Sequence, residues 1–209
     1  SVKFDSFVAT GVSVIAHPIN PYVPTSHMNV RVFFLLEEGV VTAWWFGGGY
    51  DLTPYFVFEE DVYQWHYHAM LALGDYSGDR YTRYKSQCDK YFYLPHRQEA
   101  RGVGGIFYDQ VNDLSFDEGL SLSQKVLMTY VNSYTHIVRK RSDMTFCDVH
   151  RDFQHYRRTR YAEFNLLYDR GTQFGIQSGG RIESIFASMP PSLGWMYQKS
   201  GDIKLFEKQ

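Results

Sequence analysis

The most regular pattern in the chain is an alternation between Ser26 and Leu36. One set of alternate positions begins with polar side chains and contains His27, Asn29, Arg31, Phe33 and Leu35. The other set is apolar throughout and contains Met28, Val30, Val32, Phe34 and Leu36. A period of two predicts a β-strand, with its apolar side facing a core.

A second strand is predicted from Val40 to Phe46, where β-branched and aromatic residues dominate. Glu37-Glu38-Gly39 is a plausible turn between the two strands, so we expect an antiparallel hairpin. The three glycines at 47–49 are expected to end the second strand, because glycine weakens a strand interior.

Spacings of three and four residues predict helices farther along the chain. We expect helices over 58–73, 81–93, 117–141 and 148–158, with a short strand over 106–108. After these we expect a strand from Tyr161 to Tyr168, a turn at 169–171, and strand-like pieces up to Pro190-Pro191. Hairpins mixed with helices indicate an α+β fold, an antiparallel β-sheet covered by helices, in a single domain over 1–209.

The overall composition narrows the class of protein. A net charge of −2 argues against a general nucleic-acid binder. No apolar run approaches the roughly 20 residues that span a bilayer, so we expect no transmembrane segment. Two unclustered cysteines, Cys88 and Cys147, fit neither a zinc site nor a disulfide framework and favour a reduced intracellular protein. The aromatic content of 18% suits a large core and is compatible with a planar apolar ligand.

The polar row of the first strand is the first candidate for chemistry. Alternation aims His27, Asn29 and Arg31 the same way. The fork of an arginine matches the two oxygens of a carboxylate, and a histidine can transfer protons near neutral pH. This pattern therefore indicates a polar pocket wall that binds an anion, and a solvent-facing strand surface is the alternative.

The second candidate is the segment from Trp44 to Tyr55, WWFGGGYDLTPY, which places Asp51 among aromatic residues. A carboxylate in such surroundings is costly to bury unless something donates hydrogen bonds to it, and pyrrole N–H groups are one possible donor. A structural turn with an aspartate cap is the alternative. The glycines do not form a dinucleotide-binding pattern that opens a helix.

Two further groups of residues give weaker signals. The histidines His17, His27, His66, His68 and His96 show no HExxH pattern and no HxH pair on a strand, so distant segments would have to bring them together to bind a metal. Gly179-Gly180-Arg181 places flexible backbone beside one guanidinium, a combination suited to holding a carboxylate. Cys88 falls on a predicted helix stripe and is expected to be inert core.

An ordered set of short strings in this chain resembles the oxygen-dependent coproporphyrinogen III oxidases. The strings include ATGVS from Ala9, HMNVR from His27, WWFGGGYDLTPY, LPHR from Leu94, EARGVGGIF from Glu99, RYAEFNLLYDR from Arg160, and GGR from Gly179. Together they span almost everything from Ala9 to Pro191. The family extends farther at the N-terminus, so the resemblance implies that an N-terminal segment is missing here.

The resemblance implies a flat antiparallel β-sheet flanked by helices on both faces, a homodimer and a haem-pathway reaction. Two propionates of coproporphyrinogen III would become vinyl groups, giving protoporphyrinogen IX. O2 would be the electron acceptor, and neither an organic cofactor nor a divalent metal is expected. A cytoplasmic location is expected rather than a mitochondrial one.

Individual residues carry over from the resemblance. His27 matches the proposed proton donor of the family and Asp51 the acidic residue thought to face the pyrrole nitrogens. The substrate-contacting positions match Ser13, Asn29, Val30, Arg31, Gly179, Gly180 and Arg181. His17, His66 and His96, with His27, match positions sometimes assigned to a metal. For the propionates we favour Arg31 and Arg181 over Arg160 and Arg170.

One residue departs from the family pattern: Val30 stands where an aromatic residue is usual. Alternation turns its side chain away from His27 and Arg31, so we expect altered packing behind the site and retained activity. Two other classes of function remain open. One is a module that binds a tetrapyrrole or sugar without chemistry, and the other is a metal-dependent oxygenase that uses the scattered histidines.

Overall fold

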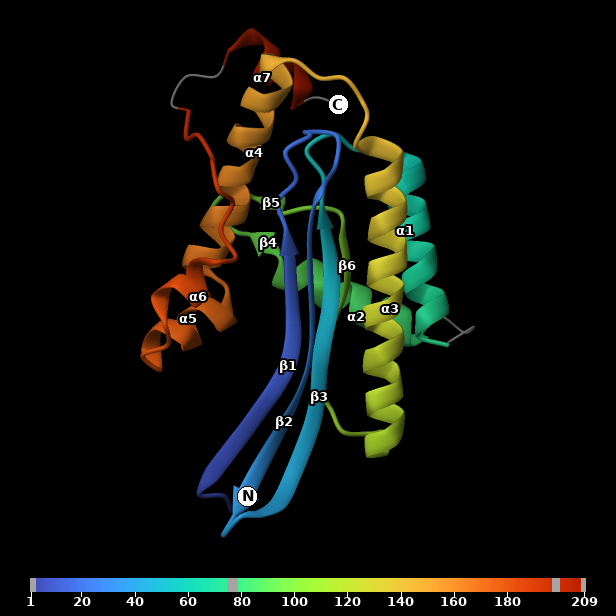
Figure 1. Cartoon of the computed structure of the whole chain (residues 1–209), viewed down its shortest axis with the longest axis vertical. Helices are drawn as coiled ribbons and strands as arrows, with labels where there is room; N and C mark the ends of the chain where they lie inside the picture. The colour runs from blue at the N-terminus through green and yellow to red at the C-terminus, as the bar shows by residue number, and fades with distance from the viewer. Residues whose placement is uncertain (1–2, 75–78, 197–199, 208–209) are drawn as a thin grey trace.

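A computed structural model describes residues 3–74, 79–196 and 200–207 of the chain. Its sheet has the strand order β1-β2-β3-β6, with every neighbouring pair antiparallel. The bounds of these strands are β1 Ser6–Ala16, β2 Thr25–Glu37, β3 Val40–Thr53 and β6 Gly104–Val111. The long hairpin of β2 and β3 forms the centre of the molecule (Figure 1).

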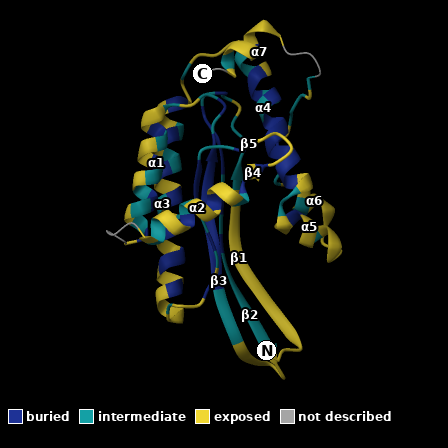
Figure 2. Ribbon diagram, turned by 180° about the vertical axis from the view of Figure 1, so that it is seen from behind, coloured by how far each residue is buried: buried dark blue, intermediate teal, exposed yellow. Residues whose placement is uncertain are grey.

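Three helices cover the apolar side of this sheet: α1 Glu59–Ala72, α2 Asp79–Tyr91 and α3 Phe116–Arg141. α1 and α3 lie side by side beside the sheet in both views (Figures 1 and 2). Met28 and Val30 of β2 are buried in the core beneath them. Tyr84 of α2 stacks on Tyr108 of β6, with ring centroids 5.0 Å apart. The apolar alternation of β2 therefore builds the main core as expected.

The C-terminal part of the chain lies on the other side of the sheet from α1 and α3 (Figure 1). It consists of α4 Asp148–Leu167, α5 Arg170–Gln177, α6 Ile182–Phe186 and α7 Gly201–Phe206. The short strands β4 Tyr93–Leu94 and β5 Glu99–Ala100 pair with each other between the sheet and α4. The α+β class with an antiparallel sheet packed against helices is confirmed. Among the described residues, no helix has both the length and the apolar character needed to cross a membrane.

The second strand does not end at the three glycines, which is a correction to the sequence prediction. β3 continues through Gly47, Gly48 and Gly49 to Thr53. The glycines fill a structural need, because a Cβ at Gly48 would lie 2.8 Å from the Tyr108 hydroxyl and one at Gly47 would lie 2.9 Å from the Arg31 guanidinium. Neighbouring side chains occupy the space that a side chain at these positions would need. The strand therefore continues through the glycines although glycine has a low β-propensity.

The strands expected after residue 160 are also wrong. Tyr161–Leu167 belongs to α4, the turn at 169–171 opens α5, and the next stretch contains α6. Every residue from Arg158 to Asn165 is buried, so this part of α4 has no polar stripe to reveal a helical period. Asp169 caps α5 by accepting a hydrogen bond from the Thr172 amide at 2.7 Å.

Candidate active site

The face of the sheet opposite α1 and α3 gathers polar side chains from adjacent strands. Directly paired residues of an antiparallel sheet lie on the same side, so the pairing registers define rows across this face. His27 of β2 pairs with Asp51 of β3, Asn29 pairs with Ser13 of β1, and Arg31 pairs with Gly47. The row predicted from alternation thus exists, and β3 and β1 extend it with Asp51 and Ser13.

Asp51 is the buried centre of this face, with 2% of its surface exposed. Its Oδ1 lies 3.1 Å from His27 Nδ1, and its Oδ2 accepts a hydrogen bond of 2.6 Å from Arg101 Nη2. Burial alone would raise the pKa of Asp51, but the Arg101 guanidinium and the His27 contact outweigh it and hold the pKa below its ordinary value. Asp51 is therefore a carboxylate at neutral pH.

Arg101 lies in the connection between β5 and β6 and is also 2% exposed. Its guanidinium carbon is 4.1 Å from the ring centroid of Phe92, 4.3 Å from Tyr161 and 4.7 Å from Phe164. Three aromatic faces and one carboxylate therefore enclose this cation. His27 is the most accessible of Asp51, Arg101 and His27, with 25% of its side chain exposed.

Arg31 lies flat against the sheet. Its Nη1 donates a hydrogen bond of 2.7 Å to Asn29 Oδ1, and its Nη2 donates one of 3.0 Å to Asp109 Oδ1 at the end of β6. The guanidinium rests over Gly47, which has no side chain to displace it. About a third of the Arg31 side chain is exposed, so the cation remains accessible from the open face.

A second arginine reaches the same carboxylate from the C-terminal part of the chain. Arg170 Nη2 at the start of α5 lies 3.6 Å from Asp109 Oδ2. Its guanidinium carbon is 5.0 Å from the Tyr91 ring centroid and 5.8 Å from that of Phe107, and those two rings stack 4.5 Å apart. Asp109 therefore holds two partly exposed guanidinium groups close together, an arrangement suited to anionic ligands.

Comparison of the sequence with known proteins shows the family to which this chain belongs. The family model described as coproporphyrinogen III oxidase matches residues 1–208. The oxygen-dependent coproporphyrinogen-III oxidase of Francisella tularensis subsp. novicida (strain U112) is 49% identical over 207 residues, which cover 97% of this chain and 67% of that protein. The chain belongs to the oxygen-dependent coproporphyrinogen III oxidase family. The recognition made from the short strings is confirmed.

The side chain of Val30 was expected to point away from His27 and Arg31. Its side chain is 8% exposed and lies in the main core with Met28, on the side away from His27 and Arg31. The structure thus has the orientation that alternation predicted, and the expected effect of Val30 on packing behind the site stays a prediction.

Two of the arginines considered for the propionates lie in unexpected surroundings. Arg160 is 5% exposed, and its Nε donates a hydrogen bond of 2.6 Å to Glu99 Oε1 while its Nη2 donates one to the Tyr156 hydroxyl. That guanidinium is used to hold α4 against β5. Arg181 is the N-cap residue of α6 and is 77% exposed, with Ser184 and Glu183 as its neighbours. Arg170 is thus the better placed partner for Arg31.

The two glycines before Arg181 do not form the open cradle suggested by the sequence. The Gly179 amide donates to the Ile176 carbonyl and the Gly180 amide to the Gly175 carbonyl, so both amides close the end of α5. Gly179 has a φ of 70°, the left-handed conformation common after a helix. A role for these glycines in binding substrate stays a prediction.

The four candidate metal histidines lie in separate surroundings. His17 contacts Thr25 and the Ser188 carbonyl, and His66 contacts the Val103 carbonyl and the Tyr81 hydroxyl. His96 contacts Glu163 and the Tyr168 hydroxyl, while His27 contacts Asp51. Over the part of the chain that the structure describes, no three His, Cys, Asp or Glu side chains gather as a metal site.

An open cavity of about 560 Å³ lies away from these polar rows. It is lined by the end of β1, the connection to β2 and the C-terminal end of α3, and includes His17, Pro18, Tyr134 and Phe146. Neither Asp51 nor Arg31 borders it, so the candidate active site is the polar open face and not this cavity.

Sequence reasoning gave no role to Arg101 or Asp109, although both contact the site. Arg101 stands in the string EARGVGGIF, and Asp109 follows the predicted strand at 106–108. Both charged residues stand among apolar and glycine residues, which indicates that they are at least partly buried. A buried charge requires a partner, so this pattern could have marked both residues as members of ion pairs. The identity of that partner depends on strand pairing over 50 residues or more of sequence.

Proposed function

We propose that this protein converts two propionate side chains of coproporphyrinogen III to vinyl groups, giving protoporphyrinogen IX in haem biosynthesis. The observation that carries the proposal is the division of the open face into two parts. Asp51 and His27 form a carboxylate–histidine pair at one end, and Arg31 and Arg170 offer cations around Asp109 at the other. Family membership supplies the reaction class.

The overall chemistry balances for each propionate. The side chain loses one β-proton, one molecule of CO2 and two electrons. O2 accepts the two electrons and two protons, one of them from solvent, and becomes H2O2. No other oxidant is required, which agrees with the oxygen-dependent reaction in the name of the relative from Francisella.

The arginines hold the carboxylates of the substrate. Arg31 and Arg170 bind propionates through charge-assisted hydrogen bonds, which fix the tetrapyrrole relative to His27. Ser13 and Asn29 lie in the row between Arg31 and His27 and contribute polar contacts from the same face, with the backbone of Val30 beside them. We also assign substrate contacts to Arg181, Gly179 and Gly180, which lie at the junction of α5 and α6.

The carboxylate–histidine pair moves the proton. His27 takes part in removing the β-proton, since its ring is the accessible titratable group of the pair. Asp51 holds the Nδ1 side of that ring and supplies a fixed negative charge, which stabilises the positive charge that develops on the macrocycle as it is oxidised. Asp51 Oδ1, the oxygen on the His27 side, retains a lone pair that can accept a pyrrole N–H.

The decisive experiment incubates the full-length protein with coproporphyrinogen III in air and under nitrogen. Products are oxidised, separated and identified by porphyrin fluorescence. We expect protoporphyrin in air and none under nitrogen. Bound substrate without a dicarboxylate product in either atmosphere would overturn the proposal and favour a binding module. Loss of turnover after exhaustive chelation, restored by one divalent metal, would favour the metal-dependent oxygenase instead.

We further propose a homodimer that works in the cytoplasm without an organic cofactor or a metal. The exposed length of β1 supports the assembly (Figure 2), and the two free cysteines suit a reducing compartment. Light scattering after size-exclusion chromatography should give twice the monomer mass of 24.5 kDa, and a monomer at micromolar concentration would contradict the assembly.

A further inference from the structure

Arg101 is a buried cation whose surroundings differ from those of the other buried arginines. It is 2% exposed and bonds to Asp51 Oδ2 at 2.6 Å and to Asn165 Oδ1 at 3.4 Å. Among the described residues, its Nε finds no hydrogen-bond partner. A buried guanidinium with an unused donor carries an unrecovered desolvation cost, so it is a poor choice for stability alone.

Arg141 provides the comparison within the same chain. It is 7% exposed, donates through Nε and Nη2 to both oxygens of Asp61, also bonds to Glu60, and lies 3.7 Å from the Phe58 ring centroid. That guanidinium is fully engaged in joining α3 to α1, as a structural arginine should be. Arg101 instead directs its shortest contact to a single carboxylate oxygen, that of Asp51.

The geometry around Asp51 explains what this contact achieves. With Oδ2 held by Arg101, the carboxylate cannot rotate freely, and Oδ1 stays directed at His27 Nδ1. Phe92, Tyr161 and Phe164 enclose the guanidinium from several directions and keep water from competing for Oδ2. The positive charge of Arg101 also keeps Asp51 ionised, although the burial of Asp51 opposes its ionisation.

We propose that Arg101 is a positioning residue for the reaction, acting through Asp51. It holds Asp51 oriented and ionised so that His27 presents its other ring nitrogen to the substrate. The kinetic form of this inference rests on the proposed function. The structural part of the inference, that Arg101 sets the orientation of the Asp51–His27 pair, can be tested without measuring turnover.

The kinetic test is a double-mutant cycle with Arg101→Met and Asp51→Asn, using turnover of coproporphyrinogen III in air. Methionine keeps an apolar stem among the three rings and removes the charge. We expect Arg101→Met to lower kcat about 100-fold with KM changed less than about threefold, as for loss of a group that supports transition-state charge. In the Asp51→Asn background, adding Arg101→Met should change kcat less than about threefold. Equal factors in both backgrounds would show that Arg101 acts independently of Asp51 and would overturn the proposal.

A conservative variant and a matched control separate positioning from folding. Arg101→Lys keeps the charge but lacks the fork that reaches both Asp51 and Asn165, so we expect it to recover about tenfold of the lost kcat. Its acid limb of kcat against pH should move to higher pH, because a weaker partner raises the pKa of Asp51. Arg141→Met should lower the thermal midpoint and leave kcat of the folded protein unchanged.

A spectroscopic measurement tests the inference without turnover. Nitrogen-15 NMR of the His27 ring should show Nδ1 protonated and hydrogen-bonded in the wild type, and this signature should be lost in Arg101→Met. An unchanged His27 signature would overturn the positioning role even if the enzyme is active. An inactive wild type with the expected change at His27 would instead reject the proposed reaction and retain the control of Asp51 by Arg101.

Discussion

At the scale of single residues, the space above Gly47 determines where Arg31 lies. A Cβ at Gly47 would come within 2.9 Å of three guanidinium atoms of Arg31. The same guanidinium donates hydrogen bonds to Asn29 and Asp109. Its position therefore depends on these two hydrogen bonds and on the absence of a side chain at Gly47. The glycine run is therefore part of the anion-binding surface, although it was expected to end a strand.

We predict that Gly47→Ala displaces Arg31 and weakens substrate binding. Losing one or two charge-assisted hydrogen bonds costs roughly 1.5–3 kcal/mol, so KM should rise about tenfold or more while kcat changes less. Steady-state kinetics with coproporphyrinogen III measures both constants. Gly201→Ala is the control, since a Cβ there meets no described atom within 4 Å. An unchanged KM in Gly47→Ala would argue against Arg31 as a propionate anchor.

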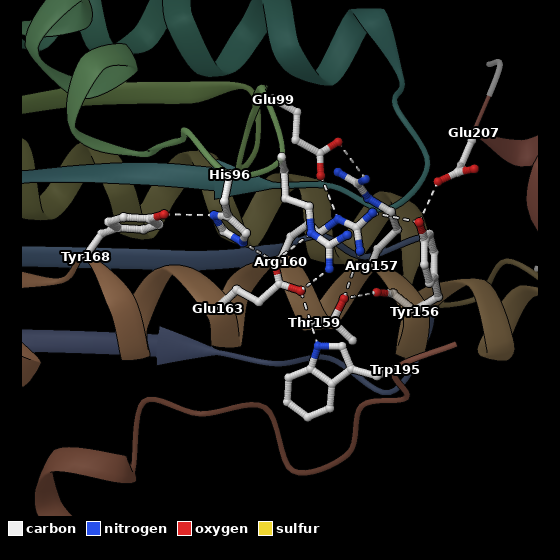
Figure 3. Close-up of polar contacts among 11 residues, drawn as sticks. His96, Glu99, Tyr156, Arg157, Thr159, Arg160, Glu163, Tyr168, Trp195 and Glu207 are labelled. Carbon is white, nitrogen blue, oxygen red and sulfur yellow. Dashed lines mark hydrogen bonds and ion pairs between the residues drawn. The ribbon is translucent and has the colours of Figure 1, made fainter. Parts of the chain in front are cut away.

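At the scale of elements, the part of α4 from Arg158 to Asn165 is buried on all sides, and residues of the β4–β5 turn pair with charged side chains of this helix. Glu163 accepts hydrogen bonds from Arg97 at 2.9 and 2.7 Å. It also accepts hydrogen bonds from His96 at 2.7 Å and from the Trp195 indole at 3.2 Å (Figure 3). Arg157 and Arg160 of the same helix both bond to Glu99 of β5. A polar sequence can therefore be buried here, because each charge meets its partner.

We predict that Glu163→Gln destabilises the fold by about 2 kcal/mol, because an amide cannot replace a carboxylate that accepts from two cations. Chemical denaturation followed by circular dichroism measures the change, and Glu59→Gln on the exposed side of α1 should change stability little.

The same variant should alter the acid sensitivity of the protein. Burial alone would raise the pKa of Glu163, but the hydrogen bonds from Arg97, His96 and Trp195 lower it to about 2. A carboxyl with a depressed pKa contributes stability that is present above its unfolded pKa of about 4.5 and is lost as pH falls toward 2. Glu163→Gln should therefore lose less stability than the wild type between those pH values, and equal losses would contradict the assignment.

At the scale of the whole molecule, His17 joins parts of the chain that are far apart in sequence. Its Nε2 donates to the Ser188 carbonyl at 2.9 Å, and its Nδ1 lies 3.2 Å from the Thr25 hydroxyl at the start of β2. Burial lowers the pKa of His17 to about 4, against the opposing effect of the Ser188 hydrogen bond and with help from the charges of Arg158 and Arg101. The folded protein thus holds this histidine neutral.

We predict that the neutral state of His17 makes the free energy of unfolding depend on pH. Between pH 6.5 and about 4, the unfolded chain binds a proton at this histidine and the folded chain does not, so stability falls as the pH is lowered. A pKa shift from 6.5 to about 4 corresponds to about 3 kcal/mol in the free energy of unfolding. His17→Gln should flatten the free energy of unfolding over this range, measured by denaturant titration at several pH values. His136→Gln on the exposed surface is the control, and identical profiles for wild type and His17→Gln would refute the prediction.

The sequence by itself determined the family, the α+β class, the hairpin of β2 and β3, and the row of His27, Asn29 and Arg31. These follow from short motifs and from a period of two, both of which are local along the chain. The tertiary structure alone decided the partners: Arg101 for Asp51, and Asp109 for both Arg31 and Arg170. It also decided that the residues from Tyr161 onward continue the helix, because burial on every side removes the periodicity that would mark a helix. Ion pairs and burial depend on which distant segments meet, and no local pattern contains that information.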